Sequence, residues 1–176
     1  EFEIFLLTAN TNYKELLNQS KLFKVKNLII TDKISYLKAI KINKNKKIKI
    51  FKDFNSLKRI LNKKIDYVMS AISGIQGLKP TYDIIKYTRK IAIANKEAII
   101  CGWPLIKKQL NKHGTKFIPV DSEHFSIWYA LKNNTNNRLE KIYITASGGP
   151  LYKMSSKKNK KCKYEDSFKP SKLENG

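Results

Sequence analysis

Short apolar runs alternate along the chain with longer segments in which apolar residues recur every three or four positions. Runs of the first kind are typical of β-strands, and several are apolar throughout, as strands buried on both faces of a parallel sheet are. The predicted strands are 2–8, 27–31, 48–51, 66–72, 90–94, 116–120 and 141–146. Segments of the second kind predict helices over 12–23, 32–42, 53–63, 81–88, 96–110 and 122–132.

Repeated strand-helix-strand units predict an α/β fold with a Rossmann-like, mostly parallel sheet and helices on both faces. Asn12, Asp32 and Asp53 stand where helix N-caps are expected. Pro104 interrupts one helical segment, so we expect a kink there or two shorter helices. In such sheets ligands bind at the carboxyl ends of the strands. The residues that follow each strand are therefore the first candidates for a site.

The two ends of the chain depart from this pattern. The sequence starts at Glu1, already inside a strand-like run and without a methionine, which predicts a fragment of a longer protein. From residue 153 apolar residues become few and lysines cluster, so 153–176 is predicted to be a linker or tail. No apolar run is long enough to span a bilayer, and no signal-peptide pattern is present.

Composition bears on possible partners. The formal net charge of +22 invites a nucleic-acid interpretation. However, 33 of the 36 basic residues are lysine, whereas base and phosphate recognition relies on the bidentate fork of arginine. A/T-rich codons would produce the same excess of Lys, Ile and Asn, so we predict no nucleic-acid partner and no membrane partner. Cys101 and Cys162 form no disulfide framework or metal motif, which predicts free thiols and a cytoplasmic location.

Polar residues follow three of the predicted strands. After "IAIA" come Asn95, Lys96 and Glu97, which open a helix. A glutamate in a first helical turn is favourable beside the helix dipole, but a lysine there is not. These residues alone leave a capped helix and a binding site equally open.

The stretch "FIPVDSEH" is the second such place. Asp121 and Glu123 are two apart, so in an extended segment their side chains leave on the same side. Carboxylates are the ligands of hard divalent cations such as Mg²⁺ or Mn²⁺. The alternative is an N-cap at Asp121 or Ser122 with Glu123 in the first turn, which the pattern alone favours. His124 is expected to be a packing or surface residue.

Glycines follow two further strands. In "IYITASGGP" the backbone N–H groups and the Ser147 hydroxyl could approach an anion, although a tight turn explains the glycines equally well. In "SAISGIQGLKPT" the glycines Gly74 and Gly77 lack the dinucleotide spacing and predict a close strand-to-helix turn.

Taken together and in this order, "AISGIQGLKPT", "IAIANKEAII", "PVDSEH" and "TASGGP" resemble the 1-deoxy-D-xylulose 5-phosphate reductoisomerase family. The resemblance covers about residues 1–156, beginning at the second strand of the family's NADPH-binding domain. It implies an NADP-dependent oxidoreductase of non-mevalonate isoprenoid biosynthesis that uses NADPH and Mg²⁺ or Mn²⁺. The implied substrate is a small sugar phosphate, 1-deoxy-D-xylulose 5-phosphate, which is isomerised and reduced to 2-C-methyl-D-erythritol 4-phosphate. The complete protein is expected to be a homodimer.

The resemblance also implies roles for particular residues. Asn95 and Glu97 would contact NADPH, as would Asn12 in "ANTN", where the family has Ala-Gly-x-Asn and this chain has lost the glycine. Lys96 would contact the substrate and take part in catalysis.

The second half of the implied site follows later strands. Asp121 and Glu123 would bind the metal, and Glu123 would also contact the substrate and serve catalysis. Ser122 and Ser147 would bind the substrate, the latter at its phosphate.

Other parts of the family's site are absent from this chain. The glycine-rich pyrophosphate loop, a third metal-binding glutamate and the remaining phosphate ligands have no counterpart in the sequence. An alternative function is therefore that of an inactive truncated fragment with only partial nucleotide or metal binding.

The predicted domains are an N-terminally truncated NADPH-binding domain (1–120), the start of an α+β catalytic domain (121–152) and the tail (153–176). If Lys172–Gly176 were encoded by AAG TTG GAA AAT GGG, a reading frame shifted by one base would give Ser-Trp-Lys-Met-Gly, which resembles the family's continuation. We therefore predict a frameshift from about residue 171, which the codons of the gene would test.

Overall fold

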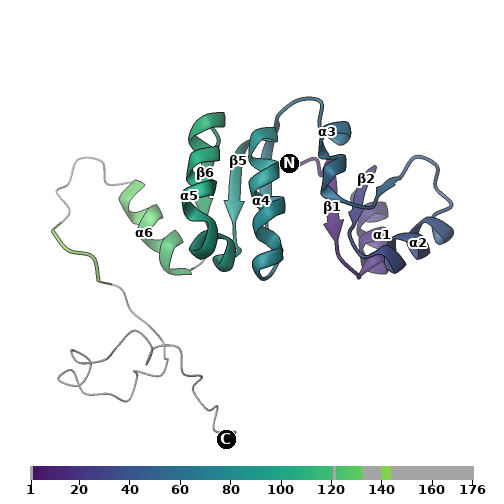
Figure 1. Ribbon diagram of the computed structural model, residues 1–176, viewed down its shortest axis with the longest axis horizontal. Helices are drawn as coiled ribbons and strands as arrows, with labels where there is room; N and C mark the ends of the chain where they lie inside the picture. The colour runs from purple at the N-terminus through teal and green to yellow at the C-terminus, as the bar shows by residue number, and fades with distance from the viewer. Residues whose placement is uncertain (1, 121, 133–139, 144–176) are drawn as a thin grey trace, which may run out of the picture. The chain divides into compact units, whose positions relative to one another are not determined.

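The computed structural model describes residues 2–120, 122–132 and 140–143. These residues form an α/β fold in which six strands alternate with helices (Figure 1). The chain divides into two compact units, residues 1–129 and 130–176. In the second unit the structure describes the end of one helix and the irregular stretch 140–143. No helix among the described residues has the length and apolar character to cross a membrane.

The first sheet contains β1 (Leu6–Ala9), β2 (Asn27–Ile30) and β3 (Lys49–Phe51), all parallel and in that order. Alternate side chains of β2 enter different cores because successive residues of a strand point to opposite faces. Leu28 and Ile30 pack with α1 (Tyr13–Leu22) and α2 (Lys33–Ile42). Ile29 packs with α3 (Leu57–Ile60), so this sheet has helices on both faces.

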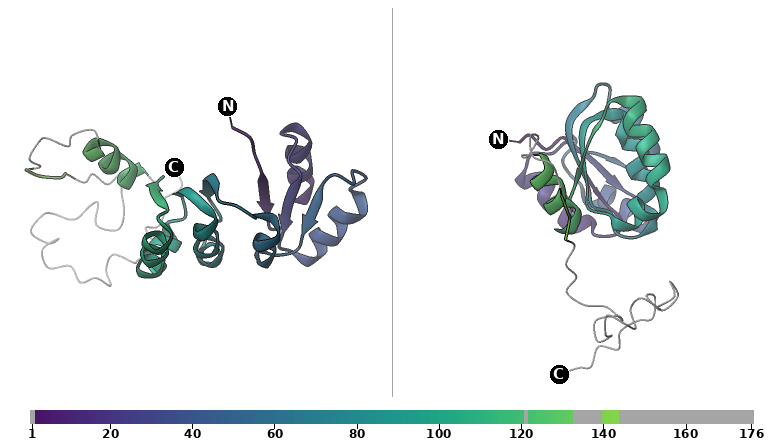
Figure 2. Two further views of the ribbon diagram at one scale, coloured as in Figure 1. Left: turned by 90° about the horizontal axis from the view of Figure 1, so that it is seen from above. Right: turned by 90° about the vertical axis from the view of Figure 1, so that its left-hand side faces the viewer.

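The second sheet contains β4 (Ile65–Ser70), β5 (Thr88–Ile93) and β6 (Lys116–Pro119), again parallel and in sequence order. The helices α4 (Leu78–Ile84) and α5 (Lys96–His113) lie in front of these strands in Figure 1 and on one side of the sheet in Figure 2. Ile91 and Ile93 of β5 are fully buried against them. The predicted fold class is confirmed.

The predicted N-caps are confirmed. The carboxamide oxygen of Asn12 accepts a hydrogen bond from Glu15 N at 3.3 Å, and Asp32 accepts one from Ser35 N at 2.7 Å. Asp53 caps the short 3₁₀ helix η1 (Phe54–Ser56). The Ser35 backbone N–H stabilises the charged form of Asp32 and so lowers the pKa of its carboxyl group.

The structure differs from the sequence expectations in three places. The described strands pair as two sheets of three and not as one sheet. The periodicity of the sequence predicts which segments are strands but not which strands pair. The segment around Pro104 is one continuous helix, α5, which is anchored by buried Ile106 and Leu110 beyond the proline. Residues 141–143 of the predicted last strand are irregular, since no described strand pairs with them, and residues 144–146 lie outside the described residues.

Two further helices predicted from the sequence, 81–88 and 122–132, have counterparts in the structure. The segment predicted as helix 81–88 begins earlier, as α4, and ends in the 3₁₀ helix η3 (Ile85–Tyr87). Helix α6 (Ser122–Lys132) follows β6, as predicted. In α6 the rings of Phe125 and Tyr129 stack at 5.8 Å between centroids, one helical turn apart.

The carboxyl end of α5 carries several positive charges. Gly114 adopts a left-handed conformation with φ of 62° and ends the helix, and Lys64 Nζ donates to the His113 carbonyl at 2.5 Å. Burial lowers the pKa of the His113 imidazole below 6.5, and the charges of Lys112, Lys64 and Lys86 lower it further.

This shift predicts acid sensitivity near neutral pH. Because folding lowers the pKa of His113, the unfolded chain takes up a proton more readily than the folded chain does. The His113 contribution is therefore fully present above pH 6.5 and is lost as the pH falls through that value toward the folded pKa. Urea unfolding between pH 7.5 and 5.5 should show this loss in the parent chain. His113→Gln should flatten the profile, and Lys112→Gln should flatten it in part; equal slopes in all three would contradict the prediction.

Candidate functional site

The carboxyl ends of β4, β5 and β6 lie at one edge of the second sheet. The register pairs Ser70 with Ile93 and Ile93 with Pro119, so the three strands end level with one another. In the sequence, the predicted motifs "AISG", "ANKE" and "DSE" follow these three strands, and Lys96 and Ser122 begin the helices α5 and α6. Strand pairing therefore brings together three stretches that are separated in sequence.

Asn95 is the best-defined member of this edge. Its side chain is 3% exposed and caps α5, because its Oδ1 accepts a hydrogen bond from Ala98 N at 2.6 Å. Its Nδ2 donates to the carbonyls of Ile72 and Gly74, the latter at 2.8 Å. The carboxamide thus joins the loop after β4 to the first turn of α5. These contacts engage its polar atoms within the protein, and the predicted contact of Asn95 with a cofactor stays a prediction.

The loop after β4 depends on two glycines for different reasons. Gly74 has φ of 74° and ψ of −179°, a conformation that is strained for residues with a side chain. Gly77 has an ordinary φ, but a Cβ there would overlap Asn95 Nδ2 and lie 2.5 Å from the Ile72 carbonyl. The close turn predicted from the sequence is confirmed, and its closeness is set by Asn95.

Lys96 and Glu97 occupy the first turn of α5, and both are exposed. The N-terminus of a helix carries partial positive charge and backbone N–H groups, which together favour an anion. The Lys96 ammonium group adds a full positive charge at the same place. This end of the sheet can therefore attract a phosphate or carboxylate group.

Asn12 lies at the carboxyl end of β1, in the other sheet. Nearby, Thr31 Oγ1 donates to Asn10 Oδ1 at 3.1 Å, and Asp32 N donates to the Asn10 carbonyl at 3.3 Å. Strand pairing does not connect this sheet with the one that contains Asn95. Asn12 is an exposed N-cap whose predicted cofactor contact stays a prediction.

Several predicted site residues lie outside what the structure describes. Asp121, the side chains of Ser122 and Glu123, and Ser147 belong to this group. Among the described residues no cluster of three His, Cys, Asp or Glu side chains could hold a metal ion. The predicted metal and substrate contacts of these four residues therefore stay predictions.

Sequence reasoning missed Ser70 and Thr81. Both are buried, and their hydroxyl oxygens lie 2.6 Å apart beside the loop after β4. Both residues stand at the ends of the stretch "SAISGIQGLKPT", but the only signal for these two hydroxyl residues themselves was a serine at the end of a strand and a threonine in the following helix. It was too weak because isolated hydroxyl residues are common in both settings.

A separate cleft of about 360 Å³ lies at the opposite, amino end of the first sheet. Asn27, Lys49 and Arg59 line it together with apolar residues, and the Arg59 guanidinium lies 5.6 Å from the centre of the Phe51 ring. Of the predicted site residues that the structure describes, none lines this cleft.

Comparison with known protein families shows to which family the chain belongs. Residues 1–102 match the model of 1-deoxy-D-xylulose 5-phosphate reductoisomerase, and residues 117–176 match the model of its C-terminal domain. The chain belongs to the 1-deoxy-D-xylulose 5-phosphate reductoisomerase family. The resemblance stated from four short motifs is thereby confirmed.

Individual members of the reductoisomerase family agree. The protein of that name from Pelagibacter ubique is 60% identical over 170 residues, which are 96% of this chain and 44% of the relative. The Zymomonas mobilis enzyme in complex with NADPH has a TM-score of 0.76 at 31% identity, over 88% of this chain and 41% of that one. A DOX-P reductoisomerase crystal structure with fosmidomycin and magnesium has a TM-score of 0.73 at 25% identity, over 89% and 42%. The chain thus spans less than half the length of these relatives.

Proposed function

We propose that this chain is part of an NADPH- and divalent-metal-dependent reductoisomerase that converts 1-deoxy-D-xylulose 5-phosphate to 2-C-methyl-D-erythritol 4-phosphate. One observation supports this most directly. Strands β5 and β6 are parallel neighbours ending in register at Ile93 and Pro119, and the motifs "ANKE" and "DSE" follow them. Residues for a cofactor, a substrate and a metal therefore leave the same edge of one sheet, where α/β proteins bind their ligands.

The first turn of α5 suits the nucleotide side of this proposal. Asn95 fixes the start of the helix, Lys96 adds positive charge, and Glu97 is exposed beside it. We assign Lys96 to the substrate, where its ammonium group would neutralise negative charge that develops on an oxygen. Bound NADPH would supply the hydride, and the structure of the Zymomonas mobilis relative contains NADPH.

The donor types of "DSE" suit the metal side. Asp121 and Glu123 offer carboxylate oxygens and Ser122 a hydroxyl, and hard cations such as Mg²⁺ and Mn²⁺ prefer oxygen ligands. Such an ion would polarise the substrate carbonyl. A related crystal structure contains magnesium. We assign Asp121 and Glu123 as metal ligands, with Glu123 also at the substrate, and Ser122 and Ser147 to the substrate itself.

The remaining assignments concern the complete protein. We propose a cytoplasmic homodimer without nucleic-acid or membrane partners, supported by the family resemblance and the scarcity of arginine. We keep the division into an NADPH-binding part, 1–120, and the start of a catalytic part, 121–152, as a proposal. The alternative function is an inactive fragment that retains partial nucleotide or metal binding, supported by the share of its relatives that the chain spans.

Binding and turnover separate these two functions. Mn²⁺ titration followed by electron paramagnetic resonance should show binding to the chain, weakened at least tenfold by Asp121→Asn and by Glu123→Gln. Glu3→Gln removes an exposed carboxylate that is far from Asp121 in the sequence, and it should leave the Mn²⁺ affinity unchanged. NADPH oxidation with Mn²⁺ and the deoxyxylulose phosphate should then be measured on this chain and on the complete protein.

Three outcomes are distinguishable. The proposed activity is supported if the complete protein turns over the substrate and its Asp121→Asn variant does not. Binding without turnover by the 176-residue chain supports the alternative for the fragment. A complete protein whose turnover is untouched by Asp121→Asn would refute the metal assignment.

A further inference from the structure

Buried hydroxyl groups form a hydrogen-bonded network beside the loop after β4, at the carboxyl edge of the second sheet. Thr81, on α4 and 1% exposed, donates its hydroxyl hydrogen to the Gly77 carbonyl at 2.7 Å. Ser70, the last residue of β4, lies with its hydroxyl oxygen 2.6 Å from that of Thr81. Since a hydroxyl has one hydrogen and that of Thr81 is used for Gly77, Ser70 must be the donor to Thr81.

The hydrogen-bonded network continues into the loops of the site. Gly77, which Thr81 holds, is so close to Asn95 that a Cβ there would overlap the carboxamide. Asn95 in turn contacts Ile72 and Gly74 and caps α5. The backbone adds a second tie, because Ala94 N donates to the Ser70 carbonyl at 2.9 Å.

We propose that Thr81 is a positioning residue for nucleotide binding. Its hydroxyl fixes Gly77, Gly77 abuts Asn95, and Asn95 sets the first turn of α5, where Lys96 and Glu97 stand. This inference rests on the proposed function for its consequence on NADPH affinity, but not for the positioning itself. None of these contacts places Thr81 against a ligand, so it acts only through Gly77 and Asn95.

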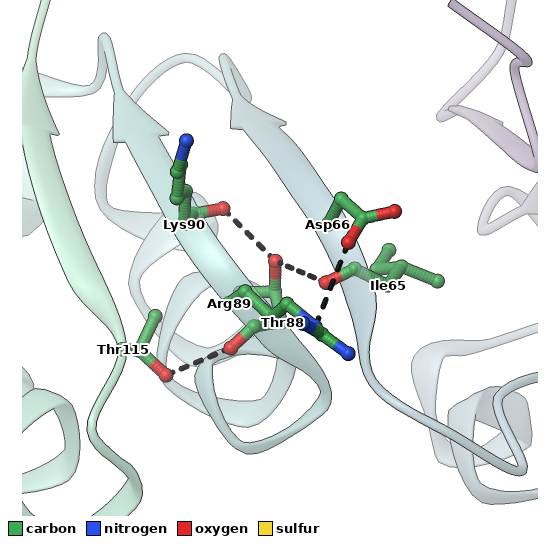
Figure 3. Close-up of polar contacts among 6 residues, drawn as sticks. All are labelled: Ile65, Asp66, Thr88, Arg89, Lys90 and Thr115. Carbon is green, nitrogen blue, oxygen red and sulfur yellow. Dashed lines mark hydrogen bonds and ion pairs between the residues drawn. The ribbon is translucent and has the colours of Figure 1, made fainter.

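The same sheet offers a matched control at its other end. Thr88, fully buried at the amino end of β5, has its hydroxyl 2.9 Å from the Lys90 carbonyl and 3.3 Å from that of Ile65 (Figure 3). Thr115 Oγ1 donates to the Thr88 carbonyl at 2.9 Å. Thr81, on α4, and Thr88, on β5, are therefore both buried threonines with satisfied hydroxyls. Only Thr81 lies behind the carboxyl edge.

The test compares Thr81→Val, Thr81→Ser and Thr88→Val in the full 176-residue chain. Valine keeps the shape of threonine but removes the hydroxyl, whereas serine keeps the hydroxyl. Amide hydrogen exchange should speed up about tenfold or more at Ala98 N and at Gly77 N in Thr81→Val. Thr81→Ser should retain the parent's protection there. Thr88→Val should lose protection near β5's amino end and keep it at Ala98.

NADPH titration gives the second measurement. Thr81→Val should weaken NADPH binding about tenfold, Thr81→Ser should restore most of the affinity, and Thr88→Val should leave it unchanged. Unchanged exchange at Ala98 in Thr81→Val would overturn the positioning role, as would equal weakening of NADPH binding by Thr81→Val and Thr88→Val. If the parent chain binds no NADPH, the proposed function fails for this fragment, while the exchange measurement still decides the positioning role.

Discussion

Asn95→Asp should lower the free energy of unfolding by about 3–5 kcal/mol, although it replaces one nitrogen by one oxygen. The new oxygen would face the carbonyls of Ile72 and Gly74, which now accept hydrogen bonds from the Asn95 amide. The two partly buried carbonyls would lose their donor and would face a carboxylate oxygen instead. The cap on Ala98 N would survive, because an aspartate oxygen accepts that bond equally well.

The measurement is equilibrium urea unfolding followed by the fluorescence of the two tryptophans, of which Trp103 packs against Phe117 at 5.3 Å between ring centroids. Asn12→Asp is the matched control, since Asn12 caps α1 through the same kind of bond at an exposed position. It should change the stability by less than about 0.5 kcal/mol, because Asn and Asp cap helices equally well. A midpoint for Asn95→Asp as high as that of Asn12→Asp would show that the Asn95 amide does not hold the loop after β4.

Gly77→Ala should destabilise the chain by about 2–4 kcal/mol, because one methyl group would be placed where there is no space. The added carbon would overlap the Asn95 amide and the Ile72 carbonyl, so the loop after β4 or the start of α5 would have to move. Either movement breaks hydrogen bonds that are buried. We therefore expect Lys96 and Glu97 to be displaced in this variant, and any NADPH affinity of the chain to fall with its stability.

Gly114 is the matched control for a glycine needed for its backbone rather than for space. It has φ of 62°, and apart from its chain neighbours and the backbone of its own helix, no described atom lies within 4 Å of the place that a Cβ would occupy. Gly114→Ala should cost about 1 kcal/mol, and Gly114→Asn less, because asparagine tolerates the left-handed conformation. At Gly77 asparagine should be worse than alanine, since the obstacle there is volume. If asparagine were tolerated equally at both positions, the close approach of Gly77 to Asn95 would not be what limits this turn.

Local chemistry made much of the fold predictable. Asn12, Asp32 and Asp53 cap their helices as expected, because a short polar side chain directly before an amphipathic segment can accept hydrogen bonds from the first backbone N–H groups of the helix. Of the two expectations at Pro104, that of two shorter helices is wrong because α5 is continuous, and the kink stays a prediction. A proline removes one hydrogen bond from a helix, but the buried contacts of Ile106 and Leu110 keep α5 continuous beyond it.

The site was predictable only in part. The motif "ANKE" could be placed after a strand, but whether Asn95 served a ligand or the protein depended on its surroundings. The structure shows an amide that binds Ile72 and Gly74 in the loop after β4 and Ala98 in the first turn of α5. Ser70 and Thr81 lie at the two ends of the motif "SAISGIQGLKPT", but the motif assigned no role to either residue, and their relation emerges only from the 2.6 Å between their hydroxyl oxygens.

The sequence by itself determined the alternation of strands and helices, the helix starts and the family, because each depends on residues that are near one another along the chain. The tertiary structure alone decided that the strands pair as two sheets of three and that the ends of β4, β5 and β6 stand level. It also decided that Gly77 must lack a side chain because Asn95 occupies the space. Such facts join residues that are far apart in sequence, and only the packing of the folded chain brings them together.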